Sequence, residues 1–326
     1  MQTIHWGIIG CGDVTELKSG PAFAKVADSR LVAVMRRDGV KAQDYARRHN
    51  VPKWYNDASK LIQDPEVNAI YIATPPDSHE HYALAAMEAG KPAYIEKPMT
   101  TTHAQAVNLV KASHDTNIKM VVAHYRRAQP YFKKIKSLLD EGAIGEVRFA
   151  RLSFFDKPLS QEALQTEKIA WRVDPAISGG GLFHDLAPHQ LDLAYYFFGD
   201  VVTIQGMATN QSKQYGADDI VSGSMLFQSG VLFEGLWCFT VDESETKDSF
   251  EIIGSEGKIT FSVFGKQIIY LTRNGKESVL PFEAPTHVQQ PMIEEVVSYF
   301  LGKGPNPCTA SEGARIMEMI DKMTQK

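Results

Sequence analysis

Short apolar runs and amphipathic stretches alternate along the first 124 residues of the chain. The apolar runs begin at Ile4, Leu31, Ala69, Ala93 and Met120. Helical patterns such as KAQDYARRH and HEHYALAAMEAG lie between them, and the second ends in glycine, as helices often do. Apolar strands separated by helices are typical of a parallel sheet covered on both faces. The pattern therefore predicts an α/β fold that begins with a doubly wound domain over residues 1–124.

The pattern changes in the remainder, residues 125–326, where apolar and polar positions alternate. Strand-like runs cover 147–155, 201–209, 220–240, 248–263 and 266–273, with turn residues at QSG, SEG and RNG. Alternation combined with hairpin turns predicts antiparallel strands that bury one face. Amphipathic helices are expected at 289–301 and from Ala310, both covering this sheet. We therefore expect a second α/β domain over 125–326.

Composition and charge limit the kinds of binding partner and the cellular location that we expect. Of 326 residues, 22% are charged, and the net charge is -5. Because the basic residues are few and scattered, we expect neither nucleic acid nor an anionic membrane as a partner. No apolar run approaches the roughly 18 residues of a membrane span, and no signal-peptide pattern is present. Three distant cysteines, Cys11, Cys238 and Cys308, fit no disulfide framework, so the expected location is the cytoplasm.

A glycine-rich turn, GIIGCGDVT, ends the first predicted strand. Read from Gly10, its pattern is G-x-G-x-x-T, in which Gly10 permits a tight turn and Gly12 lets the backbone approach a pyrophosphate. The third position is Thr15, where glycine or alanine is usual. We expect Gly10, Gly12, Asp13 and Val14 to contact a dinucleotide. A structural turn without a ligand is the alternative.

The residues after the second strand select the dinucleotide. A protein that prefers NAD carries Asp or Glu there, to accept hydrogen bonds from the ribose 2'-hydroxyl. This strand instead ends in Arg36 and Arg37, with Asp38 afterwards. A guanidinium can grip a 2'-phosphate through two parallel bonds, so we predict NADP, bound by Arg36 and Arg37. The alternative is NAD, with both arginines solvated and Asp38 on the ribose.

Two further segments follow predicted strands at the carboxyl edge of the sheet. They are ATPPDSHEHY at 73–82 and EKPM at 96–99. Ligands of doubly wound sheets bind at this edge. The cofactor contacts expected from these segments are Thr74, Pro75, His79, Glu96 and Lys97. A lysine between glutamate and proline, directly at a strand end, indicates a cation held in a fixed position. If this segment stood alone in the sequence, an ordinary surface lysine would be the better interpretation.

The segment GGGLFHDLAPHQLD begins at Gly179 and combines carboxylates with imidazoles. A helix that begins near Leu182 places Asp185, His189 and Asp192 on one face, because their spacings are four and three residues. Such a stripe can hold substrate hydroxyls, bind a metal or solvate a surface helix. We expect no metal, because hydride transfer to a nicotinamide needs none.

Together, GIIGCGDVT, ATPPDSH, EKPM and GGGLFHDLAPHQLD occur in an order that resembles the Gfo/Idh/MocA oxidoreductases over nearly the whole chain. The resemblance implies an N-terminal Rossmann domain over 1–124 and a C-terminal α/β domain for substrate binding and oligomerisation over 125–326. The large, mostly antiparallel open sheet of the second domain would carry the substrate site. The resemblance also implies that Lys97 is the catalytic or substrate-orienting lysine and that the peptide before Pro98 is cis. Asp185 and His189 would join the lysine in the active site, and Asp192 would support them.

The function expected from these residues is hydride transfer between a nicotinamide and a secondary alcohol or carbonyl of a sugar, polyol or related small molecule. His189 would be the general base, because histidine titrates near neutral pH. Lys97 would stabilise the substrate oxygen or relay its proton, and Asp185 would orient the reacting carbon. Which of Lys97 and His189 takes the proton first stays open. Secondary substrate contacts are expected from Tyr125, Arg126, Trp171 and Arg172.

Two other functions stay open on the sequence alone. One is a nucleotide-binding or sensing protein without redox chemistry, and the other is a reductase of an aldehyde, imine or biliverdin-like substrate. The segment VLFEGLWCF at 231–239 carries large side chains on both alternating faces. Because a broad apolar face is usually covered by a partner, we expect a homodimer or homotetramer.

Overall fold

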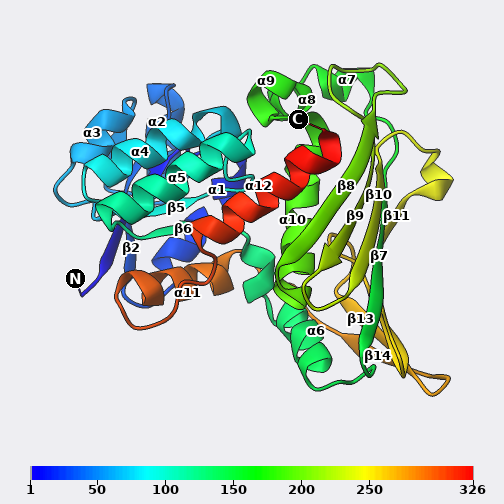
Figure 1. Ribbon diagram of the computed structural model, residues 1–326. Helices are drawn as coiled ribbons and strands as arrows, with labels where there is room; N and C mark the ends of the chain where they lie inside the picture. Colours follow the sequence, from blue (N-terminus) through cyan, green and yellow to red (C-terminus); the bar gives the residue numbers. More distant parts are fainter. Residues whose placement is uncertain (1, 326) are drawn as a thin grey trace. The chain divides into compact units, whose positions relative to one another are not determined.

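The computed structural model describes residues 2–325, which form two compact units (Figure 1). The first unit contains the chain up to Gln129 together with Pro285–Met317. The second contains Pro130–Ala284 and the residues from Glu318 onward. The chain thus returns to the first unit after the second, whereas the sequence placed the whole segment after residue 124 in one region. No helix within the described residues is long and apolar enough to cross a membrane.

The first unit is built on a six-stranded sheet in the order β3-β2-β1-β4-β5-β6, and every pair in it is parallel. The strands are β1 (Ile4–Ile9), β2 (Ser29–Met35), β3 (Lys53–Tyr55), β4 (Ala69–Ile72), β5 (Ala93–Ile95) and β6 (Met120–Val122). The helices are α1 (Asp13–Leu17), α2 (Gly39–Arg48), α3 (Ala58–Gln63), α4 (His79–Glu88), α5 (His103–Thr116) and α11 (Gln290–Phe300). Every residue of β4, β5 and β6 is buried, so both faces are covered. The predicted doubly wound sheet is confirmed.

Strand β3 is not evident from the sequence. It is only three residues long, it lies at the edge of the sheet, and its one large apolar side chain, Trp54, is exposed. A short edge strand lacks the apolar run that marks a buried strand. The other five strands of this sheet lie where the apolar runs predicted them.

The core of the first unit joins side chains from both of its chain segments. The ring of Trp6 in β1 lies 4.8 Å from that of Phe23 and 5.7 Å from that of Phe300, the last residue of α11. Helix α11 therefore packs on the first unit, and the prediction that it covers the second sheet was wrong. An amphipathic pattern shows that a helix buries one face, but it does not show against which sheet.

The second unit is built on an eight-stranded sheet in the order β14-β13-β12-β11-β7-β10-β9-β8. Only β7 and β10 pair in parallel, so the mostly antiparallel sheet is confirmed. The strands are β7 (Val147–Phe155), β8 (Val201–Thr209), β9 (Ile220–Phe227), β10 (Leu232–Cys238), β11 (Lys247–Gly254), β12 (Gly257–Phe261), β13 (Ile268–Arg273) and β14 (Lys276–Pro281). The helices are α6 (Pro130–Asp140), α7 (Gln161–Leu164), α8 (Glu167–Val173), α9 (Pro175–Ser178) and α10 (Gly181–Phe198).

Within this unit, α6 and α10 lie on one face of the sheet (Figure 1). The end of α12 (Ala310–Thr324) lies against the sheet as well, since a Cβ atom on Gly223 of β9 would come within 2.5 Å of the sulfur of Met323. Gly206 of β8, which pairs with Gly223, lies equally close to α12, because a Cβ atom placed on it would be 2.5 Å from the Cα of Met323. The prediction that the helix from Ala310 covers this sheet is therefore confirmed for the last residues of α12.

Candidate active site

The residues predicted to bind a dinucleotide follow four neighbouring strands of the first sheet. Arg36 follows β2, Gly10 follows β1, Thr74 comes shortly after β4, and Lys97 comes shortly after β5. These strands are adjacent in the order β2-β1-β4-β5, and all are parallel. Their carboxyl ends therefore meet at one edge of the sheet, which is where ligands of such sheets bind.

The two glycines of the turn have different reasons to be glycine. Gly10 has a φ of +92°, and a Cβ atom there would lie 2.7 Å from the backbone nitrogen of Thr74. The fold itself therefore requires glycine at position 10. Gly12 has a φ of -135°, and a Cβ atom there would find only the carbonyl oxygen of Gly10, at 3.9 Å. Neither the backbone nor a protein neighbour requires glycine at position 12.

Thr15, which departs from the usual third glycine of the turn, is fully buried and hydrogen-bonded. Its Oγ1 donates to the carbonyl oxygen of Gly12 at 2.8 Å. The hydroxyl of Tyr45 in α2 donates to the carbonyl oxygen of Thr15, also at 2.8 Å. Asp13 and Val14 lie between Gly12 and Thr15 and begin the short helix α1. The threonine therefore stabilises the turn from inside.

The residues after β2 have distinct surroundings. Arg36 is half-buried, and its Nη1 donates to the carbonyl oxygen of Cys11 in the glycine turn at 3.5 Å. Arg37 is exposed. Asp38 is the N-cap of α2, where its Oδ1 accepts the backbone N–H of Val40 at 3.0 Å. The carboxylate is thus engaged within its own helix, while one guanidinium lies beside the glycine turn.

His79 joins the loops that follow β4 and β5. It is fully buried, with Nε2 2.7 Å from the carbonyl oxygen of Thr74 and Nδ1 3.0 Å from that of Pro98. Burial lowers its pKa below the usual range. Pro75 precedes a short 3-10 turn in the first of these loops. The sequence predicted a cofactor contact for His79, but in the structure both ring nitrogens face protein carbonyl groups.

Glu96, the residue before Lys97, is also buried and bound by protein groups. Its Oε1 accepts hydrogen bonds from the hydroxyl of Tyr71 at 2.5 Å and from Nε2 of Gln289 at 2.6 Å. Its Oε2 accepts the backbone N–H of Lys97 at 3.2 Å. The Lys97–Pro98 peptide is cis, as the family resemblance implied. Neither Tyr71 nor Gln289 was predicted as a site residue, because Tyr71 belongs to an apolar strand and no motif contains Gln289.

Asp185, His189 and Asp192 all belong to α10 in the second unit, as their spacing predicted. The glycines before them fix the start of this helix. Gly179 ends α9 with a φ of +89°, and a Cβ atom on Gly181 would lie 2.4 Å from the Cβ of Ala217. No three His, Cys, Asp or Glu side chains within residues 2–325 are grouped as metal ligands are.

Asp185 and Arg172 form an ion pair, with Nε of Arg172 3.0 Å from Oδ2 of Asp185. The Arg172 guanidinium also lies 4.6 Å from the ring centre of Trp171, a cation–π distance. His189 is buried, and its ring lies edge-on to Phe264 at 5.6 Å between centroids. Three of the residues predicted in this unit, Trp171, Arg172 and Asp185, therefore form one contiguous cluster.

Tyr125 and Arg126, the other predicted substrate contacts, lie in the first unit after β6. They form part of a 3-10 turn, Tyr125–Ala128. The Arg126 guanidinium lies 5.6 Å from the ring centre of Tyr125. Tyr125 is almost completely buried.

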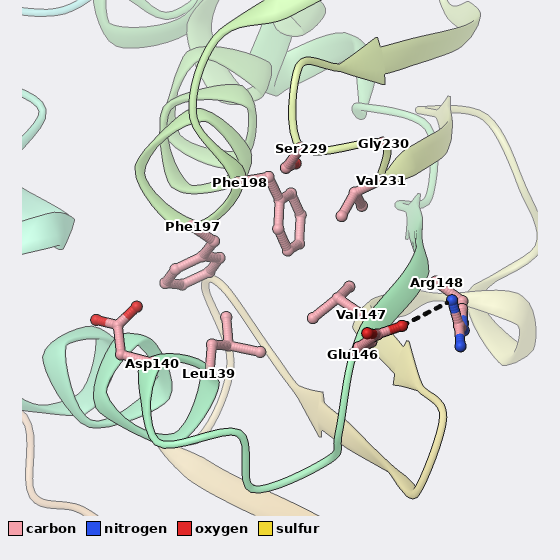
Figure 2. A pocket seen from close by; sticks show the side chains of 10 residues that line it. All are labelled: Leu139, Asp140, Glu146, Val147, Arg148, Phe197, Phe198, Ser229, Gly230 and Val231. Carbon is pink, nitrogen blue, oxygen red and sulfur yellow. Dashed lines mark ion pairs between the residues drawn. The ribbon is translucent and has the colours of Figure 1, made fainter.

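A separate pocket of about 600 Å³ in the second unit holds none of the predicted site residues (Figure 2). Leu139, Val147, Phe197, Phe198 and Val231 point into it. Of the charged residues at its margin, Glu146 and Arg148 pair with each other at 3.1 Å. Asp140, which also lines this pocket, pairs with Lys136. The charged side chains at the margin are therefore paired with neighbours, and none is placed for acid–base chemistry.

Comparisons with known proteins identify the family of both domains. Residues 4–124 match a family model described as an oxidoreductase family with an NAD-binding Rossmann fold, and residues 132–260 match the GFO/IDH/MocA C-terminal domain. Oxidoreductase P35 of Formosa agariphila is 46% identical over 318 residues, which are 98% of this chain and 97% of that protein. The 1,5-anhydro-D-fructose reductase of Ensifer adhaerens is 27% identical over 95% of this chain and 92% of its own. Levoglucosan dehydrogenase, solved with NADH and levoglucosan, has the same fold, with a TM-score of 0.86 at 22% identity over 99% of this chain and 96% of its own.

Proposed function

Because this chain belongs to the Gfo/Idh/MocA family of NAD-binding oxidoreductases, we propose that it is an NADP-dependent dehydrogenase or reductase of a sugar, a polyol or a related small molecule. The observation that carries the proposal is the row of Arg36, Gly10, Thr74 and Lys97 along one edge of the first sheet. A dinucleotide that follows this row has its adenosine end near Arg36 and its nicotinamide end near Lys97.

The glycine turn fits a dinucleotide. Gly12 is free of steric demands from the protein, so the absent side chain is best explained by a ligand that approaches the backbone there. The expected contacts of Asp13, Val14 and Pro75 complete this proposed binding edge. When bound, the nicotinamide supplies or accepts the hydride.

The preference for NADP rests on Arg36 and Asp38. The Asp38 carboxylate already accepts two backbone N–H groups of α2, which competes with a role on the ribose of NAD. Arg36 lies against the glycine turn, and its guanidinium is the group suited to a 2'-phosphate. Arg37 is exposed and adds positive charge at the same strand end.

We assign the chemistry to Lys97, His189 and Asp185. Lys97 is a cation at the end of β5, where it stabilises negative charge that develops on the substrate oxygen. His189 exchanges the hydroxyl proton as general base or acid, and Asp185, oriented by Arg172, binds a neighbouring hydroxyl. Trp171 offers an aromatic wall for a sugar ring, and Tyr125 and Arg126 are further candidate contacts. The Ensifer reductase, by its name, also acts on a sugar derivative.

We further propose a homo-oligomer formed through the second sheet. The face opposite α10 carries Leu226, Leu232, Leu236, Tyr270 and Val279, which are between 38% and 52% exposed. Strand register places Tyr270 directly beside Val279, and Leu226 beside Leu232. An exposed apolar face of this kind is typical of a subunit interface.

The three widely separated cysteines fit a cytoplasmic location.

One experiment tests the proposed reaction. The purified protein is incubated with NADP⁺ or NAD⁺ and a panel of sugars and polyols, and the absorbance of the reduced nicotinamide is recorded. The reverse reaction uses NADPH with the matching aldoses and ketoses. We expect turnover with at least one sugar-like compound and a higher kcat/KM with the NADP pair. No turnover in either direction, with a cofactor that binds, would support a nucleotide-binding protein without redox chemistry.

A further inference from the structure

Lys97 is linked to a residue far away in the sequence through the carboxylate of Glu96. We propose that Gln289 is a positioning residue for Lys97, acting through Glu96. The inference rests on the proposed catalytic role of Lys97 and extends the site to the segment of the chain that returns to the first unit.

The hydrogen bonds of Glu96 fix the direction of its carboxylate. Both bonds to Oε1 come from side chains, the hydroxyl of Tyr71 at 2.5 Å and the amide Nε2 of Gln289 at 2.6 Å. With Oε1 held by two donors, Oε2 faces the backbone N–H of Lys97, which donates to it at 3.2 Å. Loss of either donor allows the carboxylate to rotate, and the main chain of Lys97 loses a fixed acceptor.

Burial makes these donors important. Glu96 is 6% exposed, while Tyr71 and Gln289 are completely buried. A buried carboxylate needs hydrogen bonds in place of water, and bonds to a charged acceptor are stronger than bonds between neutral groups. Water has no access to Gln289 and cannot replace its amide without a rearrangement. The network therefore depends on this side chain.

The Gln289 amide accepts one hydrogen bond and donates another, and together these two bonds set its orientation. The hydroxyl of Tyr94 in β5 donates to Oε1 of Gln289 at 3.4 Å, which directs Nε2 toward Glu96. The main chain of Gln289 is anchored too, since its N–H donates to the carbonyl oxygen of Lys18 at 3.2 Å. Gln289 precedes α11, whose last residue, Phe300, packs on Trp6. Helix α11 and these hydrogen bonds therefore hold the Gln289 amide in a fixed position next to Glu96.

Gln289→Glu keeps the shape of the side chain and replaces its donor with a carboxylate. Two carboxylates at hydrogen-bond distance share one proton, so the variant is competent only when one of them is protonated. The titratable groups that face Glu96 are Tyr71 from β4, Tyr94 from β5 and His79 from α4. We expect turnover about tenfold or more below the parent near pH 8 and recovery to within about twofold near pH 5.

Gln290→Glu is the matched control, because Gln290 is the next residue and its side chain contacts Glu294 at the exposed surface. It should leave the pH profile of the parent unchanged. A Gln289→Glu profile that is parallel to that of the parent at every pH would overturn the proposal. A loss of packing alone cannot produce recovery at low pH.

Hydrogen exchange gives a readout that needs no substrate. In Gln289→Leu, the backbone amide of Lys97 should exchange about tenfold faster than in the parent, while Gln290→Leu should leave it unchanged. The dissociation constant of NADPH should stay within about twofold, and kcat should fall by about tenfold or more. Unchanged exchange at Lys97 would overturn the inference. Failure of the proposed catalytic role of Lys97 is detected separately, as full turnover in Lys97→Met, and failure of the proposed reaction as an absence of turnover in the parent.

Discussion

Oδ1 of Asp38 accepts the backbone N–H of Val40 at 3.0 Å, so the only acidic residue directly after β2 serves as the cap of α2. An N-cap carboxylate that already satisfies helix N–H groups is a poor acceptor for a ribose hydroxyl. Arg36, two residues earlier, lies against the glycine turn. These two contacts are the structural support for the proposed preference for NADP.

The first prediction is that Arg36→Asp reverses the cofactor preference. The new carboxylate repels the 2'-phosphate and can accept from the 2'-hydroxyl. Losing a charge-assisted bond to phosphate should weaken NADPH binding by about tenfold to hundredfold. Fluorescence titrations with NADPH and NADH measure both affinities. Arg30→Asp, at the other end of the same strand, is the control, and equal affinities of the unmutated protein for NADPH and NADH would contradict the assignment.

The second prediction separates Gly10 from Gly12. Gly10→Ala should lower stability by about 1–2 kcal/mol or more, because φ is +92° and the new Cβ lies 2.7 Å from the nitrogen of Thr74. Gly12→Ala should change stability by less than about 1 kcal/mol, the cost expected where the fold does not need glycine. NADPH affinity should nevertheless fall in Gly12→Ala. Thermal unfolding and cofactor titration test the pair, and an unchanged affinity in Gly12→Ala would remove the pyrophosphate from this turn.

Much of this site follows from local sequence. The apolar runs placed five strands of the first sheet, and parallel strands bring Gly10, Arg36 and Lys97 to one edge. Helical spacing placed Asp185, His189 and Asp192 on one helix, because periodicity is a local property.

The remainder depends on contacts between distant residues. Gln289 reaches Glu96 across 193 positions, and the sequence around it shows only an amphipathic helix. The same pattern predicted that α11 covers the second sheet, whereas its last residue, Phe300, packs on Trp6 in the first unit. Whether Asp38 caps its helix or faces a ribose depends on side-chain direction, which residue order does not fix.

The third prediction concerns acid stability. Two hydrogen bonds from Arg48, with a further contact from His49, lower the pKa of Glu16 from 4.5 to about 2. A lowered folded-state pKa stabilises the protein above the unfolded value, and this stabilisation is lost as pH falls from about 4.5 toward about 2. Because the pair is partly exposed, Glu16→Gln should cost at most about 1 kcal/mol at neutral pH.

Urea unfolding of the parent and of Glu16→Gln at several pH values measures this difference. The two unfolding free energies should converge as the solution is acidified below the ordinary glutamate pKa. Glu88→Gln, an exposed change at the end of α4, serves as the control. A difference that grows toward acid pH would contradict the assigned ion pair.

The fourth prediction concerns the open face of the second sheet. Leu236→Asp places a charge among exposed apolar residues and should weaken self-association by about tenfold or more. Sedimentation velocity at micromolar concentration measures the change. Leu17→Asp, at an exposed leucine of α1, should have no effect on association. A parent protein that sediments only as the 36.2 kDa monomer would exclude the proposed interface.

In the proposed mechanism, Lys97 acts in the chemical step, while the glycine turn and Arg36 hold the cofactor. Lys97→Met keeps most of the aliphatic stem and removes the charge. His189→Asn should also slow turnover, and the double variant should lose less than the sum of both effects if the residues share one proton path.

The most direct measurement compares turnover and NADPH affinity in the parent and in Lys97→Met. If the ammonium stabilises the developing negative charge, kcat should fall by about two to three orders of magnitude. The dissociation constant of NADPH should change by less than about threefold, because Lys97 lies beyond the contacts of the adenosine end. Unaltered turnover in Lys97→Met would remove the lysine from the mechanism.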